Sequence, residues 1–594
     1  MKNRLRSEID QKDKWDLTRI YQNEKAFNQD YEKAKTLLEE LTAYEGKIMT
    51  SSNSLYETLE LERKLDEILT KLFIHANLYY YEDMKNNDAD SLRIKIDSLA
   101  DDVSSKTAFI LPEMLQTDYK KFVAENEKLK KYEFSLEKMY RFKEYTLSDV
   151  EEKLLAKVSS VLGTGGTSYS KLNNADIDLG YIKDENGKKV RFNTQLYTDM
   201  IHGSDRPTRK RAFAKMYDYY ISKKYTISSL YISTIKENVL FSSLRGYDSA
   251  LERSLYKDNV TTSVYKNLIE TTHRNLPSVH KYMDVKKKMI GVSKMHMYDT
   301  YTEPVFETKE HIEFEDAQKL ITEALKPLGT TYVSDLQKAF TEGWIDKYPN
   351  EGKRSGAYQW GPYKTPFVSV NYNYKIDDVS TLAHELGHAM HTYYSDHNQS
   401  TIYNNYPIFL AEIASTVNEA LLSDYLLKNA KSKEDKIKYI SEFLEKTRAT
   451  IYRQVMFAEF EMLVHEMEEE KTPLTQESLC KVYYDLNKLY FGPNVVSDDY
   501  IQYEWMRIPH FHRPFYVYKY ATGLASALAL ATDIINEVPN AQERYLDFLK
   551  SGCSKYPLET LKDAGVDLES GETIEKAFEL FNQRVEELND LINE

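Results

Sequence analysis

The chain has 594 residues, of which 41% are hydrophobic and 29% are charged, and its formal net charge is −15. This composition is that of a folded globular protein rather than a disordered one, and the acidic balance argues against a nucleic-acid partner, because phosphate binding needs a basic surface. The two cysteines, Cys480 and Cys553, lie in no CxxC motif, so we expect neither a disulfide framework nor a cysteine-based zinc site.

The beginning of the chain, MKNRLRSEIDQKDKWDL, lacks the apolar run of a secretory signal. The most apolar stretch, LASALALATDII from Leu524, is far shorter than the roughly 18 apolar residues that indicate a membrane span. We therefore expect a cytoplasmic protein without membrane association.

Helical periodicity dominates residues 25–160. Apolar residues recur there every three or four positions with few breakers, as in SLYETLELERKLDEILTKLFIHANLYY. This pattern predicts an N-terminal bundle of long helices. The glycines of GTGGTS, residues 163–168, lack the GK[ST] ending of a phosphate-binding loop and follow no strand, so we interpret them as an ordinary flexible loop.

Two short strand-like runs then interrupt the helices. The residues between them, DENG at 184–187, have the chemistry of a hairpin turn. This break predicts a domain boundary near residue 200. The expected division is an N-terminal helical domain over residues 1–200, which ends in this hairpin and loop region, and a second helical domain over residues 201–594.

A second non-helical region covers residues 352–372. Its end, FVSVNY, alternates apolar and polar residues in the manner of a β-strand. Helical patterning resumes from Asp377 and continues to the end of the chain. The fold class expected from these patterns is therefore mainly α with a small β element.

The segment HELGH at residues 384–388 has the spacing of a metal site. Positions i and i+4 of a helix lie on one face, so the imidazoles of His384 and His388 can reach one tetrahedral metal ion. Glu385 lies beside the first ligand, where it can take a proton from metal-bound water. The flanking residues are small or apolar, which predicts a buried helix, and paired histidines in a buried helix need partners.

A catalytic zinc site normally has three protein ligands and a water. His391 shares the histidine face, but its Cα is about 10 Å along the axis from that of His384, so we interpret it as a packing or supporting residue. Glu412 and Glu419, in IFLAEIASTVNEALL, are better candidates, because an unpaired carboxylate on so apolar a helix is costly. Both lie on one face, and their spacing alone does not decide which one is the ligand.

Segments along most of the chain carry a family resemblance. They are WDLTRIY, SLRGYDSALE, GWIDKYPNEGKRSGAY, TLAHELGHAMHTYYSDH, YPIFLAEIASTVNEALLSDYLL, IPHFHRPFYVYKYATG and SGCSKYPLETLKDAGVD. In this order they resemble peptidase family M3, specifically its oligoendopeptidase F branch. The resemblance implies a zinc-dependent endopeptidase, with one zinc ion per chain, that hydrolyses internal bonds of short, unstructured oligopeptides. It also implies a two-lobed helical fold with a deep central channel, in which the domain over residues 201–594 is catalytic.

The resemblance further implies roles for particular residues. Glu412, the first glutamate of ExxSxxNE, would be the third zinc ligand, with Glu419 supporting the ligands from behind. The strand-like segment would present an edge to which the peptide pairs through backbone hydrogen bonds. Its substrate-binding residues would be Phe367, Val368, Ser369 and Val370.

A histidine and tyrosines late in the chain would stabilise the oxyanion. In HFHRPFYVYKY the residues chosen are His510, Tyr516 and Tyr520. Tyr518 lies between them, and His512 stands where the family usually has an aromatic residue, so the assignment within this segment stays open.

Two other functions compete with this one. A peptide-binding protein with a structural zinc would need a closed site, usually with four protein ligands and often with cysteines. No such set is visible, and Glu385 would serve no purpose in one. An exopeptidase would need a group that binds a substrate terminus, and no such group can be identified from the sequence. No protein partner is evident.

Overall fold

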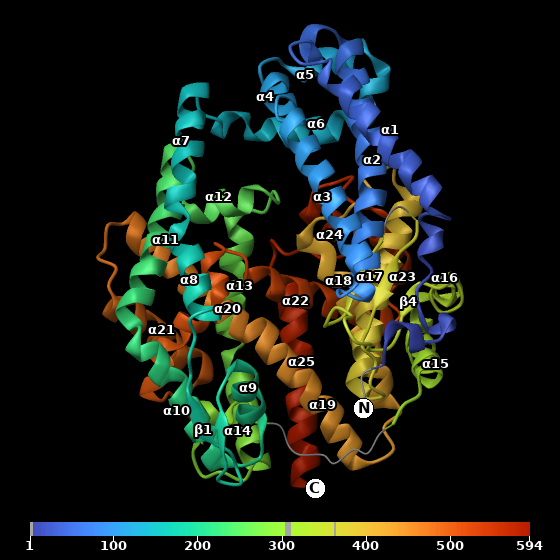
Figure 1. The fold of residues 1–594 in the computed structure, drawn as a ribbon. Helices are drawn as coiled ribbons and strands as arrows, with labels where there is room; N and C mark the ends of the chain where they lie inside the picture. The colour runs from blue at the N-terminus through green and yellow to red at the C-terminus, as the bar shows by residue number, and fades with distance from the viewer. Residues whose placement is uncertain (1–3, 303–310, 362–363) are drawn as a thin grey trace. The chain divides into compact units, whose positions relative to one another are not determined.

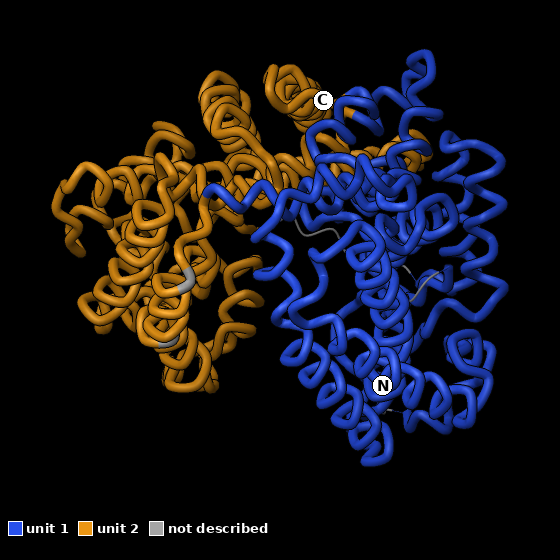
Figure 2. Tube along the Cα trace, turned by 90° about the horizontal axis from the view of Figure 1, so that it is seen from above, with its two compact units in different colours: residues 1–144, 309–422, 530–565 blue, residues 145–308, 423–529, 566–594 orange. Residues whose placement is uncertain are grey.

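The computed structural model describes residues 4–302, 311–361 and 364–594 (Figure 1). The fold is mainly α, as predicted. The contacts divide the chain into two compact units, each built from three separate stretches of sequence (Figure 2). Unit 1 comprises residues 1–144, 309–422 and 530–565, and unit 2 comprises residues 145–308, 423–529 and 566–594. Among the described residues, no helix combines the length and the apolar character needed to cross a membrane.

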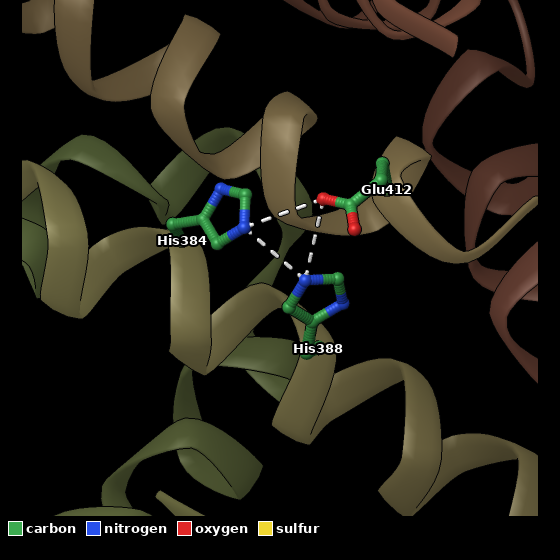
Figure 3. A group of neighbouring side chains, drawn as sticks. All are labelled: His384, His388 and Glu412. Carbon is green, nitrogen blue, oxygen red and sulfur yellow. Dashed lines mark hydrogen bonds and ion pairs between the residues drawn. The ribbon is translucent and has the colours of Figure 1, made fainter. Parts of the chain in front are cut away.

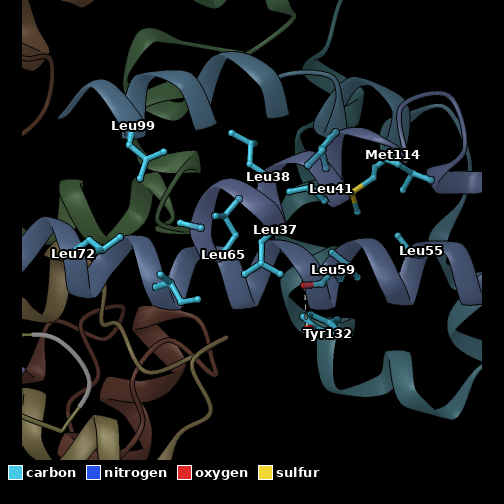
Figure 4. Packing of buried hydrophobic residues seen from close by; sticks show 14 of the residues in the cluster. Leu37, Leu38, Leu41, Leu55, Leu59, Leu65, Leu72, Leu99, Met114 and Tyr132 are labelled. Carbon is cyan, nitrogen blue, oxygen red and sulfur yellow. Dashed lines mark hydrogen bonds between the residues drawn. The ribbon is translucent and has the colours of Figure 1, made fainter. Parts of the chain in front are cut away.

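The first helices of unit 1 form a bundle of the predicted kind. They are α1 (Glu24–Thr42), α2 (Ser52–Glu82), α3 (Asn87–Thr107), α4 (Ile110–Leu115), α5 (Tyr119–Glu125) and α6 (Glu133–Tyr140). Asn23, Ser51 and Asn86 each cap one of the three long helices by accepting a backbone N–H of its first turn. The apolar faces meet in a leucine-rich core, part of which is shown in Figure 4, and Leu41 and Leu72 are completely buried in it.

The later helices of unit 1 include the one that carries the HELGH segment. They are α15 (Phe314–Ala324), α16 (Thr330–Thr341), α17 (Ile376–Asn398), α18 (Ile408–Lys428), α23 (Ala541–Lys550) and α24 (Pro557–Asp563). α17 carries HELGH and packs against α15, α16 and α23. α18 begins in unit 1 and extends past residue 422 into the first residues assigned to unit 2.

A three-stranded sheet in unit 1 has the order β4-β6-β5. Its strands are β4 (Ile345–Asp346), β5 (Tyr358–Trp360) and β6 (Phe367–Ser369). β6 confirms the strand predicted from FVSVNY, and it pairs parallel with β4 and antiparallel with β5.

The position of β6 corrects the prediction that this segment presents an open edge. β6 is the central strand, so both of its edges already have a partner strand, and the N–H of Val368 donates to the carbonyl of Trp344 (2.9 Å). All four side chains are buried as well, so they cannot contact a peptide from solvent. The residues to which this correction applies are Phe367, Val368, Ser369 and Val370.

Unit 2 is also helical, with two small sheets. Its α-helices are α7 (Asp149–Leu162), α8 (Thr164–Asn174), α9 (Thr194–His202), α10 (Arg206–Ser222), α11 (Lys224–Arg245), α12 (Ala250–Tyr256), α13 (Thr262–Arg274), α14 (Leu276–Met289), α19 (Lys433–Thr447), α20 (Arg453–Glu469), α21 (Gln476–Phe491), α22 (Tyr518–Ile535) and α25 (Glu572–Asn593). The end of α22, from residue 530 on, is assigned to unit 1. The strands of unit 2 are β1 (Tyr181–Lys183), β2 (Lys189–Arg191), β3 (Met295–His296) and β7 (Val495–Val496). β1 and β2 pair antiparallel and form the predicted hairpin, in which Gly187 has a φ of +79°. Residue 200, where the sequence predicts a domain boundary, lies in α9 within unit 2.

The glycines at residues 163–168 form no loop, contrary to the interpretation of the sequence. α8 begins at Thr164 and contains both Gly165 and Gly166. A Cβ on Gly165 would lie 3.0 Å from the carbonyl oxygen of Leu230 in α11. Glycine weakens a helix by about 1 kcal/mol relative to alanine, but here it lets α8 pack closely on α11, and this packing outweighs the low helix propensity.

Candidate metal centre

α17 and α18 cross at a glycine. A Cβ on Gly387, the glycine of HELGH, would lie 2.4 Å from the Cα of Ser415 in α18 and 2.7 Å from the carbonyl oxygen of Ala414. Any side chain at this position would therefore push the two helices apart. The crossing is also held by Asn418, whose Nδ2 donates to the carbonyl oxygen of Ala383 (3.1 Å).

This crossing brings together the three predicted metal ligands. In Figure 3 both imidazoles and the carboxylate point toward a common centre. The Nε2 atoms of His384 and His388 are 3.2 Å apart, and Oε2 of Glu412 lies 3.4 Å from the first and 3.5 Å from the second. Ligand atoms about 2.0–2.1 Å from a tetrahedral zinc ion stand roughly 3.3 Å from one another. The three atoms therefore fit a zinc site whose fourth position is left to water or substrate.

Glu419 lies behind the first histidine. Its Oε1 is 3.2 Å from Nδ1 of His384, on the side of the ring away from the common centre. A carboxylate there accepts the ring N–H and so directs Nε2 toward the metal position. The geometry thus separates the two glutamates that spacing alone left equivalent: Glu412 faces both Nε2 atoms, and Glu419 faces the opposite ring nitrogen.

Glu412 and Glu385 have opposite electrostatic environments. The imidazoles of His384 and His388 lower the pKa of Glu412, whose side chain is 56% exposed, so this group is present as a carboxylate that solvent can reach. Glu385 is only 6% exposed, and desolvation raises its pKa. A glutamate with a raised pKa accepts a proton more readily at neutral pH.

His391 has the packing role that the sequence indicates. It is 1% exposed and its ring stacks on that of Tyr406, with 3.7 Å between centroids and 3° between planes. Burial lowers the pKa of His391 to about 3, so the imidazole is neutral. It belongs to the packed interior behind the metal centre.

The late residues chosen for the oxyanion form one cluster in unit 2. The ring centroids of His510, Tyr516 and Tyr520 lie 5.5–6.3 Å apart, and the hydroxyl of Tyr520 is 3.3 Å from Nε2 of His510. All three side chains are half-buried. Burial lowers the pKa of His510, so the imidazole is neutral near pH 7.

His512 and Tyr518, the two alternatives in that segment, contact other side chains of unit 2. His512 stacks on Tyr169 of α8 (4.2 Å between centroids), and its Nδ1 is 2.9 Å from the hydroxyl of Thr234 in α11. Tyr518 is completely buried and its ring packs against Tyr265. Both side chains are therefore part of the interior of unit 2.

Sequence reasoning missed β5, one of the two edge strands of the three-stranded sheet. Among the described residues β5 pairs only with β6, so its other edge has no partner strand. β5 packs beside α17, where the hydroxyl of Thr392 donates to Oε1 of Gln359 (3.3 Å). This edge strand thus lies next to the helix that carries HELGH.

Comparisons with known proteins agree with this architecture. The model of peptidase family M3 matches residues 199–580, and the model described as oligopeptidase F matches residues 113–178. Oligopeptidase PepF of Bacillus subtilis is 39% identical, and the match covers 99% of this chain and 88% of that protein. An oligoendopeptidase F homolog of Borreliella burgdorferi is 38% identical over 99% of both chains.

Solved structures show the same fold. The crystal structure of oligoendopeptidase-F from Enterococcus faecium superposes with a TM-score of 0.74 at 32% identity, covering 96% of this chain and 99% of that one. A crystal structure from Chlamydophila abortus gives a TM-score of 0.93 at 35% identity, over 99% of this chain and 100% of the other. The chain therefore belongs to peptidase family M3, in its oligopeptidase F branch, and is a metalloendopeptidase.

Proposed function

We propose that the protein is a zinc-dependent endopeptidase that hydrolyses internal bonds of short, unstructured oligopeptides, with one zinc ion per chain. The observation that carries this proposal is the mutual spacing of 3.2–3.5 Å between two imidazole nitrogens and one carboxylate oxygen. A structural zinc site would be closed by a fourth protein ligand. Among the described residues, the group that could hold a metal consists of His384, His388 and Glu412.

The chemistry divides between the metal and the protein. When bound, zinc supplies a Lewis acid that lowers the pKa of a water toward about 7 and polarises a peptide carbonyl. Glu385 takes the proton of the attacking water and delivers it to the leaving amine, as its buried position and raised pKa favour. His510, Tyr516 and Tyr520 stabilise the negative charge that develops on the carbonyl oxygen.

The outer edge of β5 bears on the conformation in which a substrate would bind. We propose that an extended peptide adds to the outer edge of β5 and pairs through its backbone. Backbone pairing accepts many side chains, which favours a loose sequence preference, and it requires a segment without structure of its own. The predicted absence of nucleic-acid, membrane and protein partners and the predicted cytoplasmic location also belong to this proposal.

The proposal is tested with purified protein and a mixed peptide library. We expect mass spectrometry to show cuts at internal bonds, metal analysis to give about one zinc per chain, and a chelator to stop cleavage. Hydrolysis at full rate by the metal-free protein would contradict the zinc dependence. Cuts confined to the peptide ends would indicate an exopeptidase instead.

Replacing Glu412 with alanine is expected to lower the zinc content of the purified protein, because the variant retains only two of the three ligand atoms. The matched change is Glu419→Ala, which removes the support behind His384 and should weaken zinc binding by about 10–100-fold while a site with three ligands remains. Zinc titration against a competing chelator measures both. If Glu412→Ala binds zinc as tightly as the wild type and Glu419→Ala does not, Glu419 is the ligand.

Tyr520→Phe is expected to lower kcat by about 10²–10³-fold and to change KM little, because the hydroxyl acts on charge that exists only in the transition state. Tyr518→Phe, two residues away in the same helix, is the matched control. The ring of Tyr518 packs in the interior, so the kcat of the Tyr518→Phe variant should stay at the wild-type value. Steady-state kinetics on one peptide measure kcat and KM for both variants. An unchanged kcat for Tyr520→Phe would show that its hydroxyl does not stabilise the transition state.

A further inference from the structure

A fully buried glutamate in unit 2 has no role in the mechanism above. Glu461, in α20, is 0% exposed, and Oε2 of its carboxyl has no hydrogen-bond partner among the described residues. Its other oxygen, Oε1, accepts the backbone N–H of Phe515 (2.7 Å). Within the described residues no lysine or arginine forms an ion pair with it, and burial raises the pKa of Glu461 well above its usual range. Among the described residues, its carboxyl group is therefore held by one hydrogen bond, which comes from a backbone N–H.

The residue that Glu461 contacts has an unusual backbone. Phe515 has a φ of +51°, in the left-handed region that residues with a Cβ seldom adopt. Its ring is 2% exposed and packs against His465 of α20, with 4.7 Å between centroids, and against Tyr265 of α13 at 5.9 Å. Such a conformation persists only where its surroundings enforce it.

Both polar groups of one peptide bond are held at this point. The N–H of Phe515 donates to Glu461, and the carbonyl oxygen of Pro514, the other half of the same peptide group, accepts the hydroxyl of Ser254 in α12 (3.0 Å). A peptide group is planar, so two hydrogen bonds from opposite sides fix its orientation. The next residue along the chain is Tyr516.

We propose that Glu461 is a positioning residue: together with Ser254 it locks the peptide group between Pro514 and Phe515, and so sets where Tyr516 stands. Tyr516 belongs to the cluster with His510 and Tyr520, at 6.3 and 5.5 Å between ring centroids. This inference rests on the proposed function, because it matters for catalysis only if that cluster acts on the substrate.

The inference is tested by a pair of substitutions of similar size. Glu461→Gln keeps a carbonyl oxygen that can accept the N–H of Phe515, so its kcat should lie within about twofold of the wild-type value. Glu461→Met has no acceptor, and we expect its kcat to fall by about 10–100-fold with KM little changed, since a displacement of about 1 Å can have an effect of that size. If the Glu461→Gln and Glu461→Met variants lower kcat equally, the hydrogen bond from the N–H of Phe515 does not position Tyr516.

A double-mutant cycle separates positioning from general loss of stability. If Glu461 acts through Tyr516, Glu461→Met should have almost no further effect on kcat in a Tyr516→Phe background. Effects that multiply in the double variant would overturn the inference while leaving the endopeptidase proposal in place. If Tyr516→Phe alone has wild-type kcat, both the role of Tyr516 and this inference are wrong.

Ser254→Ala provides a second route that leaves the core intact, should Glu461→Met fail to fold. It removes the hydrogen bond to the other half of the same peptide group, and its side chain is only half-buried. We expect a kcat about 2–10-fold below wild type, and this loss should also vanish in the Tyr516→Phe background. A loss that persists there would contradict the inference. A wild-type protein that cleaves no peptide would instead refute the proposed function itself.

Discussion

Replacing Glu385 with glutamine is expected to lower kcat by about 10²–10⁴-fold while zinc stays bound. The amide has nearly the size of the carboxyl group and leaves His384, His388 and Glu412 unchanged, but it cannot accept a proton from the attacking water. Single-turnover kinetics on a defined peptide, together with metal analysis of the same sample, measure both parts of the prediction.

The matched control lies at the start of the same helix. Asp378→Asn alters a carboxylate in the first turn of α17 that accepts the backbone N–H groups of Asn373 and Lys375, which precede the helix. This change should lower the stability of the helix start and leave kcat near the wild-type value. A Glu385→Gln protein with zinc bound and near-normal kcat would show that another group takes the proton.

Gly387→Ala is expected to damage both the fold and the metal centre. The added Cβ would lie 2.4 Å from a backbone carbon of α18, so the helices must separate. Overpacking of this kind costs about 1–3 kcal/mol of unfolding free energy. Because Glu412 lies on α18 and the histidines on α17, we also expect zinc affinity to fall. Urea unfolding and a zinc competition titration are the two measurements.

Gly523 provides the control for the intrinsic effect of alanine in a helix. It lies inside α22, and a Cβ there would meet no atom within 4 Å. Gly523→Ala should therefore stabilise the protein by about 0.4–1 kcal/mol, because alanine restricts the unfolded chain more than glycine does. If Gly387→Ala behaves like Gly523→Ala and keeps its zinc affinity, the close helix crossing does not hold the site together.

The metal centre was largely predictable from sequence because two of its ligands, His384 and His388, lie four residues apart in one helix. The spacing of His384 and His388 follows from the helix repeat, which a sequence displays directly. The choice between Glu412 and Glu419 does not, because it depends on how two helices cross, and a crossing is a property of tertiary packing. The glycine inside HELGH was a visible sign of that close contact, since glycine weakens a helix interior unless something needs the space.

The two wrong predictions, the open edge of FVSVNY and the loop at GTGGTS, also failed because they depend on tertiary contacts. FVSVNY reads correctly as a strand, but its central position in the sheet depends on pairing with β4 and β5, which precede it in the chain. GTGGTS has poor helix propensity, and contact with α11 overrides that local preference. Propensity and periodicity describe a segment and its own neighbours, whereas strand order and helix crossings are decided by residues far away along the chain.

The interleaving of the two units has a consequence for biosynthesis. Domains generally fold as units, the N-terminal one first, while the chain is still growing. Here α17 leaves the ribosome well before α23, the helix that packs against it, and α14 leaves it long before α25, its partner at the end of unit 2. Neither unit can be completed early, so the nascent protein keeps apolar helix faces uncovered until translation is almost finished. We therefore expect newly made chains to depend on chaperones. Truncated chains that lack the last helices should be degraded rather than accumulate as partly folded protein.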